Sequence, residues 1–264
     1  LLALPRADAA RLGVDAAPLE AAAKRLKAQV AAGKLPGFIS CVVKEGRLVH
    51  YKASGYADLC ARLPMRADTL FRLYSQTKPV TVVGALLLLE RGALGLNDPV
   101  AKFIPSFEHV KVGDALDAPA RPMVVRHLLA HTSGVGFGPG FGYEPENEYE
   151  EAYVGVVGRV DRGEVESLAD WCDEIAKLPL RFHPGTDWGY GYSSDILGRV
   201  VEVASGQALD VFLKSEVLDP LGMSDTFFAV PADKAPRLSA LYKREPWDGR
   251  GPRVAFVTAV APAP

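Results

Sequence analysis

One segment of the chain, residues 75–91, is apolar on every side of the helix that it predicts. From Val80 to Leu89 it contains only valine, threonine, glycine, alanine and leucine. Apolar residues on all sides, rather than along one stripe, are typical of a helix enclosed by protein. Polar residues precede this run, and a lysine, Lys78, stands at the mouth of the helix. The segment predicts a globular core. A lysine at this position is usually a solvated surface residue, so a chemical role for Lys78 needs further support.

Composition restricts the kinds of partner. The 264 residues are 48% hydrophobic, which is enough for one large domain or two closely packed ones. A formal net charge of −2, without long basic runs, argues against nucleic acid as a partner. The run Val80–Leu89 is about half of what spans a bilayer, so we expect a soluble protein without a transmembrane segment.

The cysteines and the first residues of the chain indicate in which cellular compartment the protein is expected. Cys41, Cys60 and Cys172 are odd in number and never form a CxxC pair, so neither disulfides nor a cysteine zinc site is indicated. We expect all three to be buried as small apolar residues. The start, LLALPRADAA, lacks the basic region of a secretory signal and fits a trimmed leader or an artificial boundary. A cytoplasmic protein is favoured, with a periplasmic or secreted one as the alternative.

Local patterns predict how the chain is organised. Alanine, leucine and lysine in helical spacing predict a surface helix over Ala17–Ala32, and two β-branched runs hinged at Glu45–Gly46 predict a hairpin packed against it. Residues 124–217 are mostly helical in pattern, around a long loop from Gly134 to Tyr153 that has the length of a functional lid or binding loop.

These patterns divide the chain into three parts. Residues 1–74 hold the N-terminal helix and hairpin of an α/β portion. Residues 75–220 form a mainly helical domain. Residues 221–264 return towards the α/β portion, apparently without C-terminal strands to close its sheet.

Ser75 and Lys78 form a chemically complete pair. Side chains three residues apart on a helix lie on one face, so the serine oxygen and the lysine amine can touch. Pro79 fits the first turn of a helix and not a deeper one, which places Ser75 at or next to the helix start. There the backbone N–H groups and the helix dipole would stabilise an oxyanion. The pair therefore predicts a nucleophile and its base, although an N-capping serine beside an ordinary cation has the same spacing.

Five longer segments together resemble the serine β-lactamase-like superfamily, in the branch of class C β-lactamases, family VIII carboxylesterases and related transesterases. They cover roughly residues 30–230, in the family's order. They read GKLPGFISCVVKEGRLV, DTLFRLYSQTKPVTVVGALLLLERGALGLNDPV, VVRHLLAHTSG, HPGTDWGYGYSSDILGRVVEVASG and LDPLGMSDTFF. The resemblance implies an α+β fold of the β-lactamase/transpeptidase type, with an antiparallel sheet flanked by helices and a mainly helical domain.

The resemblance also implies an acyl-enzyme mechanism, with Ser75 as nucleophile, Lys78 as its partner and a tyrosine completing the base. Trp188, Tyr190, Asp195 and Gly198 match the spacing of the esterase branch, which favours Tyr190 over Tyr192. Independently of the family, a phenol titrates near 10 and acts as a base only if a nearby ammonium stabilises the phenolate. Lys78 would supply that charge.

Two departures from the family pattern concern the substrate. Lactamases of this class carry an asparagine two places after the tyrosine; here Tyr192 stands there, which favours esters over β-lactams and makes Tyr192 a candidate substrate-binding residue. The family's third motif, whose backbone N–H completes the oxyanion hole beside that of Ser75, is not evident before Pro264. We therefore expect a truncated or cleaved chain whose sheet is incomplete, with a second fragment of the same polypeptide as partner.

The expected function is a serine carboxylesterase that hydrolyses small or short-chain esters through acyl-Ser75, with acyl transfer to an alcohol as an accompanying reaction. A class C-type β-lactamase or a D-alanyl-D-alanine peptidase is the alternative among enzymes, and a catalytically silent ligand-binding relative is the alternative of another class. No cofactor is expected, and no Gly-x-Ser-x-Gly elbow of an α/β-hydrolase is present. His127 and His131, four apart, fit capping and packing better than zinc binding, because no third ligand stands out.

Overall fold

The computed structural model describes residues 4–138, 145, 147–244 and 254–257. The chain separates into two compact units, a terminal unit of residues 1–72 and 228–264 and a helical unit of residues 73–227. The boundaries predicted from the sequence lay at 74/75 and 220/221. Ser75 and Lys78 thus belong to the helical unit.

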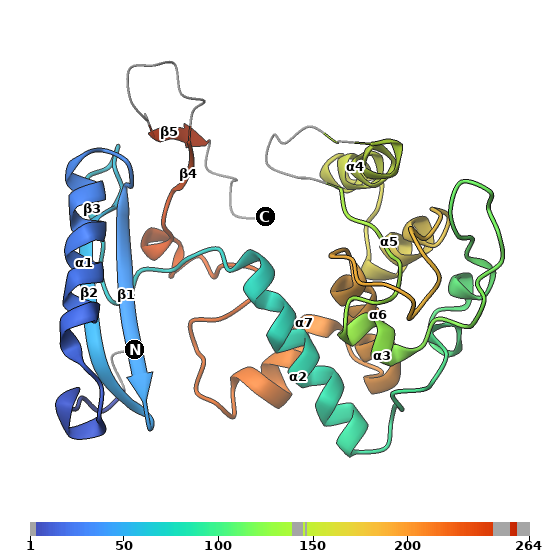
Figure 1. The fold of residues 1–264 in the computed structure, drawn as a ribbon, viewed down its shortest axis with the longest axis horizontal. Coiled ribbons are helices and arrows are strands. Elements are labelled where there is room, and N and C mark those ends of the chain that lie inside the picture. Colours follow the sequence, from blue (N-terminus) through green and yellow to red (C-terminus); the bar gives the residue numbers. More distant parts are fainter. Residues whose placement is uncertain (1–3, 139–144, 146, 245–253, 258–264) are drawn as a thin grey trace. The chain divides into compact units, whose positions relative to one another are not determined.

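The terminal unit contains the predicted helix and hairpin. Helix α1 spans Ala16–Ala31 and lies along a sheet of order β1-β2-β3, in which β1 (Gly37–Lys44) and β2 (Arg47–Asp58) are antiparallel (Figure 1). A short strand, β3 (Leu63–Pro64), pairs with β2. The hairpin turns at two residues with positive φ, Glu45–Gly46, a pair that matches the twist of the strands. Both sequence predictions are confirmed here.

The segment after residue 240 contains two strands that the sequence did not predict. β4 (Leu241–Arg244) pairs antiparallel with β5 (Val254–Val257) in a separate two-stranded sheet, and the Ala240 N–H donates to the Ala57 carbonyl of β2. These strands do not join the sheet β1-β2-β3, so the absence of strands that close that sheet stays a prediction. Each strand has only four residues, too few to show a clear alternation of apolar and polar side chains. Pairing with a partner strand, rather than local pattern, specifies them.

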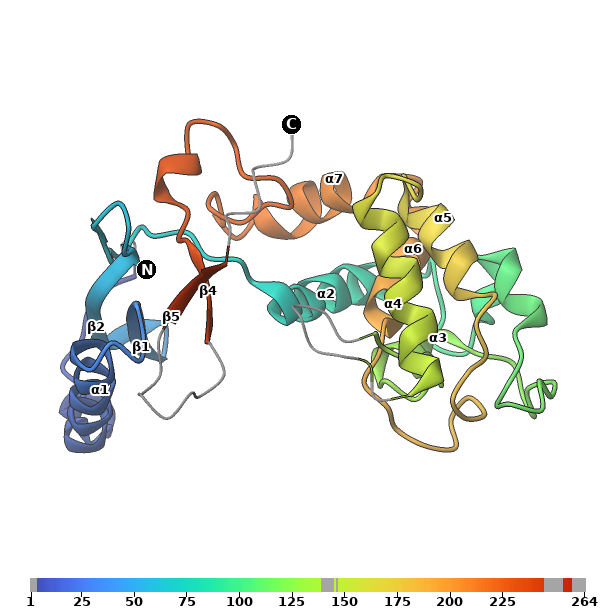
Figure 2. The same cartoon turned by 90° about the horizontal axis from the view of Figure 1, so that it is seen from above.

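The helical unit packs α6 against α2, α3 and α5 (Figures 1 and 2). Part of the predicted loop Gly134–Tyr153 is helical, since α4 begins at Glu148 with Asn147 as its N-cap. The helices are α2 (Thr77–Glu90), α3 (Val125–Leu129), α4 (Glu148–Asp161), α5 (Leu168–Ile175), α6 (Ser193–Ser205) and α7 (Leu209–Leu213), which a π-helical turn (Lys214–Leu218) extends. Short 3₁₀ turns span Ala10–Leu12, Tyr74–Gln76, Val100–Lys102, Pro105–His109 and Ala235–Arg237.

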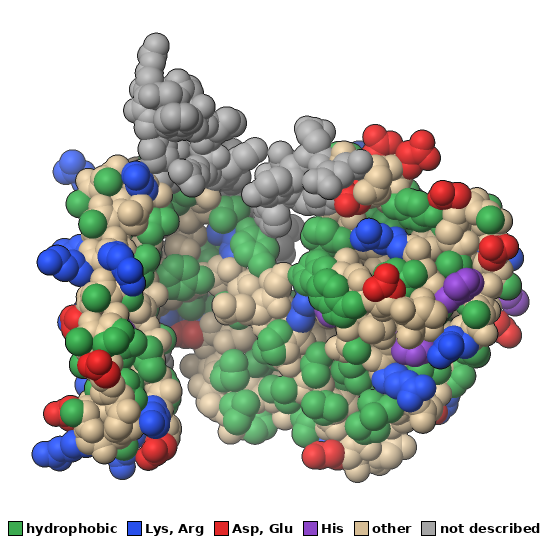
Figure 3. All heavy atoms as spheres, in the orientation of Figure 1, with side chains coloured by type: hydrophobic (Ala, Val, Ile, Leu, Met, Phe, Trp, Pro, Cys, Tyr) green, Lys and Arg blue, Asp and Glu red, His purple; other side chains and the backbone are tan. Residues whose placement is uncertain are grey.

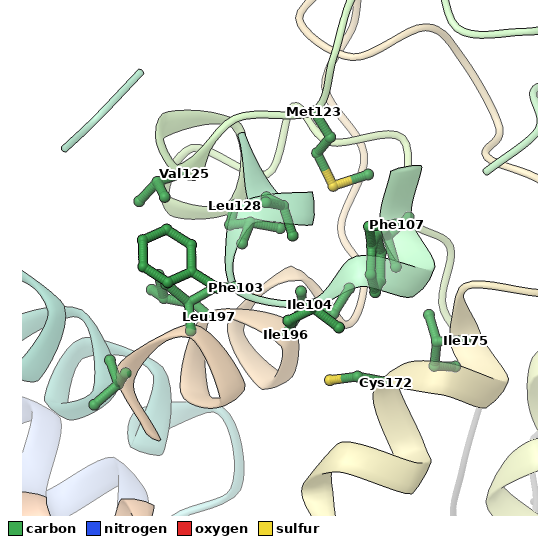
Figure 4. Close-up of a cluster of buried hydrophobic side chains, with 14 of the residues drawn as sticks. Phe103, Ile104, Phe107, Met123, Val125, Leu128, Cys172, Ile175, Ile196 and Leu197 are labelled. Atoms are coloured by element: carbon green, nitrogen blue, oxygen red, sulfur yellow. The ribbon is translucent and has the colours of Figure 1, made fainter. Parts of the chain in front are cut away.

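One hydrophobic core occupies the helical unit, and Figure 4 shows part of it. Ile196 and Leu197 of α6 lie close to Phe103 and Ile104, while Cys172 and Ile175 come from α5. Ile196 and Leu197 are fully buried, so helix α6 is fixed along this face. Helix α6 begins at Ser193, directly after Tyr192. The core that fixes α6 therefore also fixes the end of the loop that carries Tyr190 and Tyr192.

Removing a core side chain of α6 is expected to destabilise the helical unit. Leu197→Ala deletes a side chain that is 0% exposed, and a cavity of this kind costs about 2–5 kcal/mol of unfolding free energy. The exposed Val203→Ala on the same helix is the control and should change that free energy by less than about 0.5 kcal/mol. Urea unfolding measures both; equal losses would contradict the burial of Leu197.

The structure corrects two predictions of burial. Helix α2 buries Thr81, Gly84, Ala85 and Leu88, but Val83 and Leu86 are each 42% exposed. Its buried face meets α6 and α7, and Val83 and Leu86 lie on the opposite face of the helix. Of the cysteines only Cys172 is buried, whereas Cys41 and Cys60 are exposed. Cys41 lies on β1 and Cys60 in the turn between β2 and β3, positions whose exposure no local pattern reveals.

Charges of both signs are interspersed on the face of the molecule shown in Figure 3. Among the described residues, no helix combines the length and the apolar character needed to cross a bilayer.

Candidate active site

Ser75 lies in a tight turn that leads into helix α2. It is the middle residue of the 3₁₀ turn Tyr74–Gln76, and α2 starts two positions later, at Thr77. Tyr74 before it has a φ of 46°, in the left-handed region that non-glycine residues seldom adopt. Such strained backbone is often found at functional positions. The serine is therefore presented at the positive end of a 14-residue helix, close to where the sequence placed it.

Three side chains meet at this turn. The Ser75 Oγ and the Tyr190 Oη lie 2.7 Å apart, the ordinary length of a hydroxyl hydrogen bond in which either group can donate. Lys78 Nζ donates to Ser75 Oγ at 3.4 Å, a long contact, and lies 4.8 Å from the centre of the Tyr190 ring. The structure thus brings together the three residues that the sequence singled out, across 115 positions of sequence between serine and tyrosine.

The surroundings of Tyr190 favour its deprotonated form. Burial raises the pKa of the phenol, but the hydrogen bonds from Lys78 and Ser75 and the charge of Lys78 outweigh burial and hold the pKa below 10.0. An ammonium next to a phenol stabilises the phenolate. Tyr190 can therefore accept the proton of Ser75, with Lys78 as the stabilising cation.

Tyr190 belongs to no helix or strand and is held by its neighbours. The ring of His131 stacks on it at 5.2 Å between centroids with an interplanar angle of 13°, and Phe137 meets it edge-on at 5.4 Å. Sequence reasoning did not assign these two residues to the site. His131 precedes Thr-Ser-Gly in one of the segments that carry the family resemblance, and this was the available signal.

Gly191 allows the Tyr190 loop to approach the segment after α3. A Cβ at Gly191 would lie 2.1 Å from the carbonyl oxygen of Val135 and 2.5 Å from that of Gly136. The Tyr192 N–H donates to the same Gly136 carbonyl at 3.1 Å. Only glycine fits between these backbone atoms, so the position of Tyr190 depends on it.

Gly191→Ala is expected to displace Tyr190. The new methyl group would force the two segments apart, which should cost about 1–3 kcal/mol of stability and lower kcat about 10- to 100-fold through misalignment. Gly155→Ala in α4 is the control, because its Cβ would meet nothing within 4 Å and alanine favours a helix. Ester turnover and thermal unfolding of both variants check this; full activity in Gly191→Ala would refute it.

The contacts of Tyr192 differ from those of Tyr190. Its hydroxyl donates to the carbonyl of Gly138 at 3.1 Å, and its ring packs against Phe137, Tyr153 and Trp171. Burial raises the pKa of Tyr192 to about 12. It is thus suited to structure rather than to proton transfer, and these contacts do not support the predicted substrate-binding role of its hydroxyl.

Tyr192 also lines a pocket of about 460 Å³. Its walls are mostly apolar and come from α4, α5 and the start of α6, and Asp195 is among its lining residues. Burial raises the pKa of Asp195, and the charge of Lys78 offsets this only in part. Asp195, one of the residues in the matched spacing, thus lines the pocket and is close enough to Lys78 to feel its charge.

The two histidines have separate roles. His127 Nδ1 accepts the N–H of Val124 at 3.2 Å and so caps the start of α3, as the capping interpretation predicted. His131 packs on Tyr190 instead. Within the described ranges, no three histidine, cysteine or acidic side chains gather as a metal site.

The sequence also matches known proteins. Residues 22–263 fit the family described as Beta-lactamase, which covers most of the chain. This chain belongs to the β-lactamase family. One of its relatives is Esterase EstB of Burkholderia gladioli, which is 37% identical over 200 residues. The match covers 74% of this chain and 47% of EstB. The chain spans about half the length of the curated relatives that it matches.

Solved structures agree with the family assignment. EstCE1, described as a hydrolase with promiscuous acyltransferase activity, has a TM-score of 0.70 and 27% identity over 85% of this chain and 56% of its own. Simvastatin synthase (LovD) of Aspergillus terreus has a TM-score of 0.73 over 93% of this chain and 61% of its own, and at 24% identity it supports the fold alone. The β-lactamase/transpeptidase-like α+β fold predicted from the sequence is confirmed.

Proposed function

We propose that this protein is a serine carboxylesterase that cleaves small or short-chain esters through an acyl-Ser75 intermediate. The observation that carries the proposal is the contact of Ser75 Oγ with Tyr190 Oη at 2.7 Å, beside the Lys78 ammonium. A hydroxyl within hydrogen-bond reach of a base is the signature of an activated nucleophile. The name of Esterase EstB supports an ester substrate, and the description of EstCE1 as a hydrolase with promiscuous acyltransferase activity supports hydrolysis through acyl transfer.

The first half of the reaction forms the acyl-enzyme. The Tyr190 phenolate accepts the Ser75 proton while the serine oxygen attacks the ester carbonyl. Negative charge then develops on the carbonyl oxygen, and the Ser75 N–H and the start of α2 would stabilise it. When the tetrahedral intermediate collapses, the ester C–O bond breaks and Tyr190 returns the proton to the departing alcohol. The Lys78 ammonium stabilises the phenolate whenever it forms.

The second half releases the acyl group. A water molecule attacks the acyl-Ser75 carbonyl, its proton passes to Tyr190, and the same proton returns to Ser75 as the carboxylic acid leaves. An alcohol in place of water gives a new ester, which is acyl transfer, the promiscuous activity ascribed to EstCE1. Hydrolysis and transfer thus use the same three side chains.

A comparison of substrates tests the proposal. The full-length protein is assayed with nitrophenyl acetate and butyrate, a chromogenic cephalosporin and a D-alanyl-D-alanine peptide. We expect kcat/KM to be highest for the short esters, because Tyr192 stands where lactamases of this class carry an amide side chain. Faster turnover of the cephalosporin or the peptide would replace the esterase proposal by the corresponding alternative. No turnover of any, together with no labelling by a serine-directed phosphonate, would favour a catalytically silent ligand-binding protein.

A further inference from the structure

We propose that His131 is a positioning residue whose imidazole, stacked on the ring of Tyr190, holds the phenol oxygen in line with Ser75. The inference rests on the proposed function, since it explains how the proton acceptor of that reaction is kept in place. The rings are 5.2 Å apart and nearly parallel, at 13°. Offset stacking of this kind is a favourable arrangement of two aromatic rings.

Tyr190 needs such support because its backbone supplies little. It lies outside helices and strands between two glycines, Gly189 and Gly191, which are the residues with the greatest backbone freedom. Its side chain is 36% exposed, so a packed core does not enclose it. Phe137 meets the ring edge-on at 5.4 Å, and Lys78 Nζ lies 4.8 Å from its centre. The ring of His131 is the aromatic contact that lies flat against the Tyr190 face and so limits its rotation.

His131 is attached to the same loop through its backbone. Its carbonyl accepts the N–H of Gly189 at 3.0 Å, and the next carbonyl, of Thr132, accepts the N–H of Gly185 at 2.8 Å. His131 itself has a φ of 55°, in the left-handed region. The residue thus holds the loop by its carbonyl and the tyrosine by its ring, and its unusual backbone allows both contacts.

The chemistry of the imidazole fits a role through its face rather than its nitrogens. The Nδ1 atom is buried and has no hydrogen-bond partner among the described residues. Burial, and then the nearby charge of Lys78, lower the pKa of His131. At neutral pH the ring is therefore uncharged, and it does not compete with the Lys78 ammonium as partner of the Tyr190 phenolate.

His131→Asn removes the ring while keeping a residue type that tolerates positive φ. We expect kcat for nitrophenyl acetate to fall about 10- to 100-fold with little change in KM, because orientation rather than binding is lost. The pKa of Tyr190, isolated by ultraviolet titration against a Tyr190→Phe reference, should rise towards the ordinary value of about 10 as contact with Lys78 and Ser75 loosens. A purely structural residue would leave this pKa unchanged.

Two further variants separate stacking from stability. His127→Asn removes the histidine four residues earlier in the same segment, which is buried and caps α3, and should lower the melting temperature while leaving the pKa of Tyr190 unchanged. His131→Phe keeps an aromatic face but suits positive φ less well than asparagine. If stacking matters, the Phe variant is more active than the Asn variant despite its poorer backbone fit.

The results distinguish failure of this inference from failure of the proposed function. An unchanged Tyr190 pKa in His131→Asn, or an equal shift in His127→Asn, would overturn the positioning role even if the wild type hydrolyses esters. If His131→Phe folds and its kcat is no higher than that of His131→Asn, the stacking role of His131 is likewise refuted. The phenol titration requires no turnover, so it decides the role of His131 even if the wild type hydrolyses no ester and the esterase proposal falls.

Discussion

Ser75→Ala is expected to abolish covalent labelling by a phosphonate ester and to lower esterase kcat by at least about 10⁴-fold, as loss of a covalent nucleophile does. The phosphonate phosphorus is attacked by the Ser75 oxygen, its leaving group departs, and the adduct adds a fixed mass to the intact protein. The wild type should gain this mass once. The alanine variant has no oxygen at this position and should gain none.

A second serine variant controls for non-specific labelling. Ser205→Ala changes a serine at the end of α6, where the hydroxyl donates to the carbonyl of Glu202 and accepts the N–H of Gln207, away from the site. We expect it to label and to hydrolyse esters as the wild type does. An adduct on Ser75→Ala, located by peptide mapping to another residue, would show that the nucleophile lies elsewhere and would remove the basis of the proposed mechanism.

Tyr190→Phe is expected to lower kcat about 10²- to 10⁴-fold, the usual contribution of a positioned acid–base group. The substitution removes one oxygen, the atom 2.7 Å from Ser75, and leaves the ring to stack on His131. Folding should therefore be preserved while proton transfer is lost. Tyr153→Phe is the matched control: its buried hydroxyl accepts the N–H of Gly136, and burial raises its pKa to about 12, so it stays protonated.

Loss of the Tyr153 hydroxyl should cost about 1–3 kcal/mol of stability, because the Gly136 N–H is left unpaired, while most activity remains. Equal activity of Tyr190→Phe and Tyr153→Phe would contradict the assignment of Tyr190 as the base. Together the two variants separate the chemical role of a phenol from its structural role within one aromatic cluster.

The pH dependence of the wild type follows from the same group. The base form of Tyr190 is the phenolate, so kcat/KM should rise as pH increases through its pKa. The hydrogen bonds from Lys78 and Ser75 and the charge of Lys78 hold that pKa below 10.0 despite burial. The rising limb should therefore lie below the ordinary phenol range, and Tyr190→Phe should lose it. A limb that persists in Tyr190→Phe would assign the titration to another residue.

The sequence by itself determined the elements whose information is local. Ser75 and Lys78 are one helical turn apart, so their proximity follows from the geometry of any helix that starts there. The hairpin at Glu45–Gly46 is likewise specified by two adjacent turn residues. Tyr190 lies 115 residues from Ser75, and it could be chosen over Tyr192 only because the spacing around it resembles that of a known family.

Only the tertiary structure decided what depends on residues distant in sequence. In the structure His131 stacks on Tyr190, and Val83 and Leu86 of α2 are exposed. The hydroxyl of Tyr192 donates a hydrogen bond to the carbonyl of Gly138. Burial and ring contacts are set by neighbours from other segments, and a local pattern does not contain their positions. The sequence thus determined the residues on which the proposed chemistry rests, and the packing of the loops decided how Tyr190 is held.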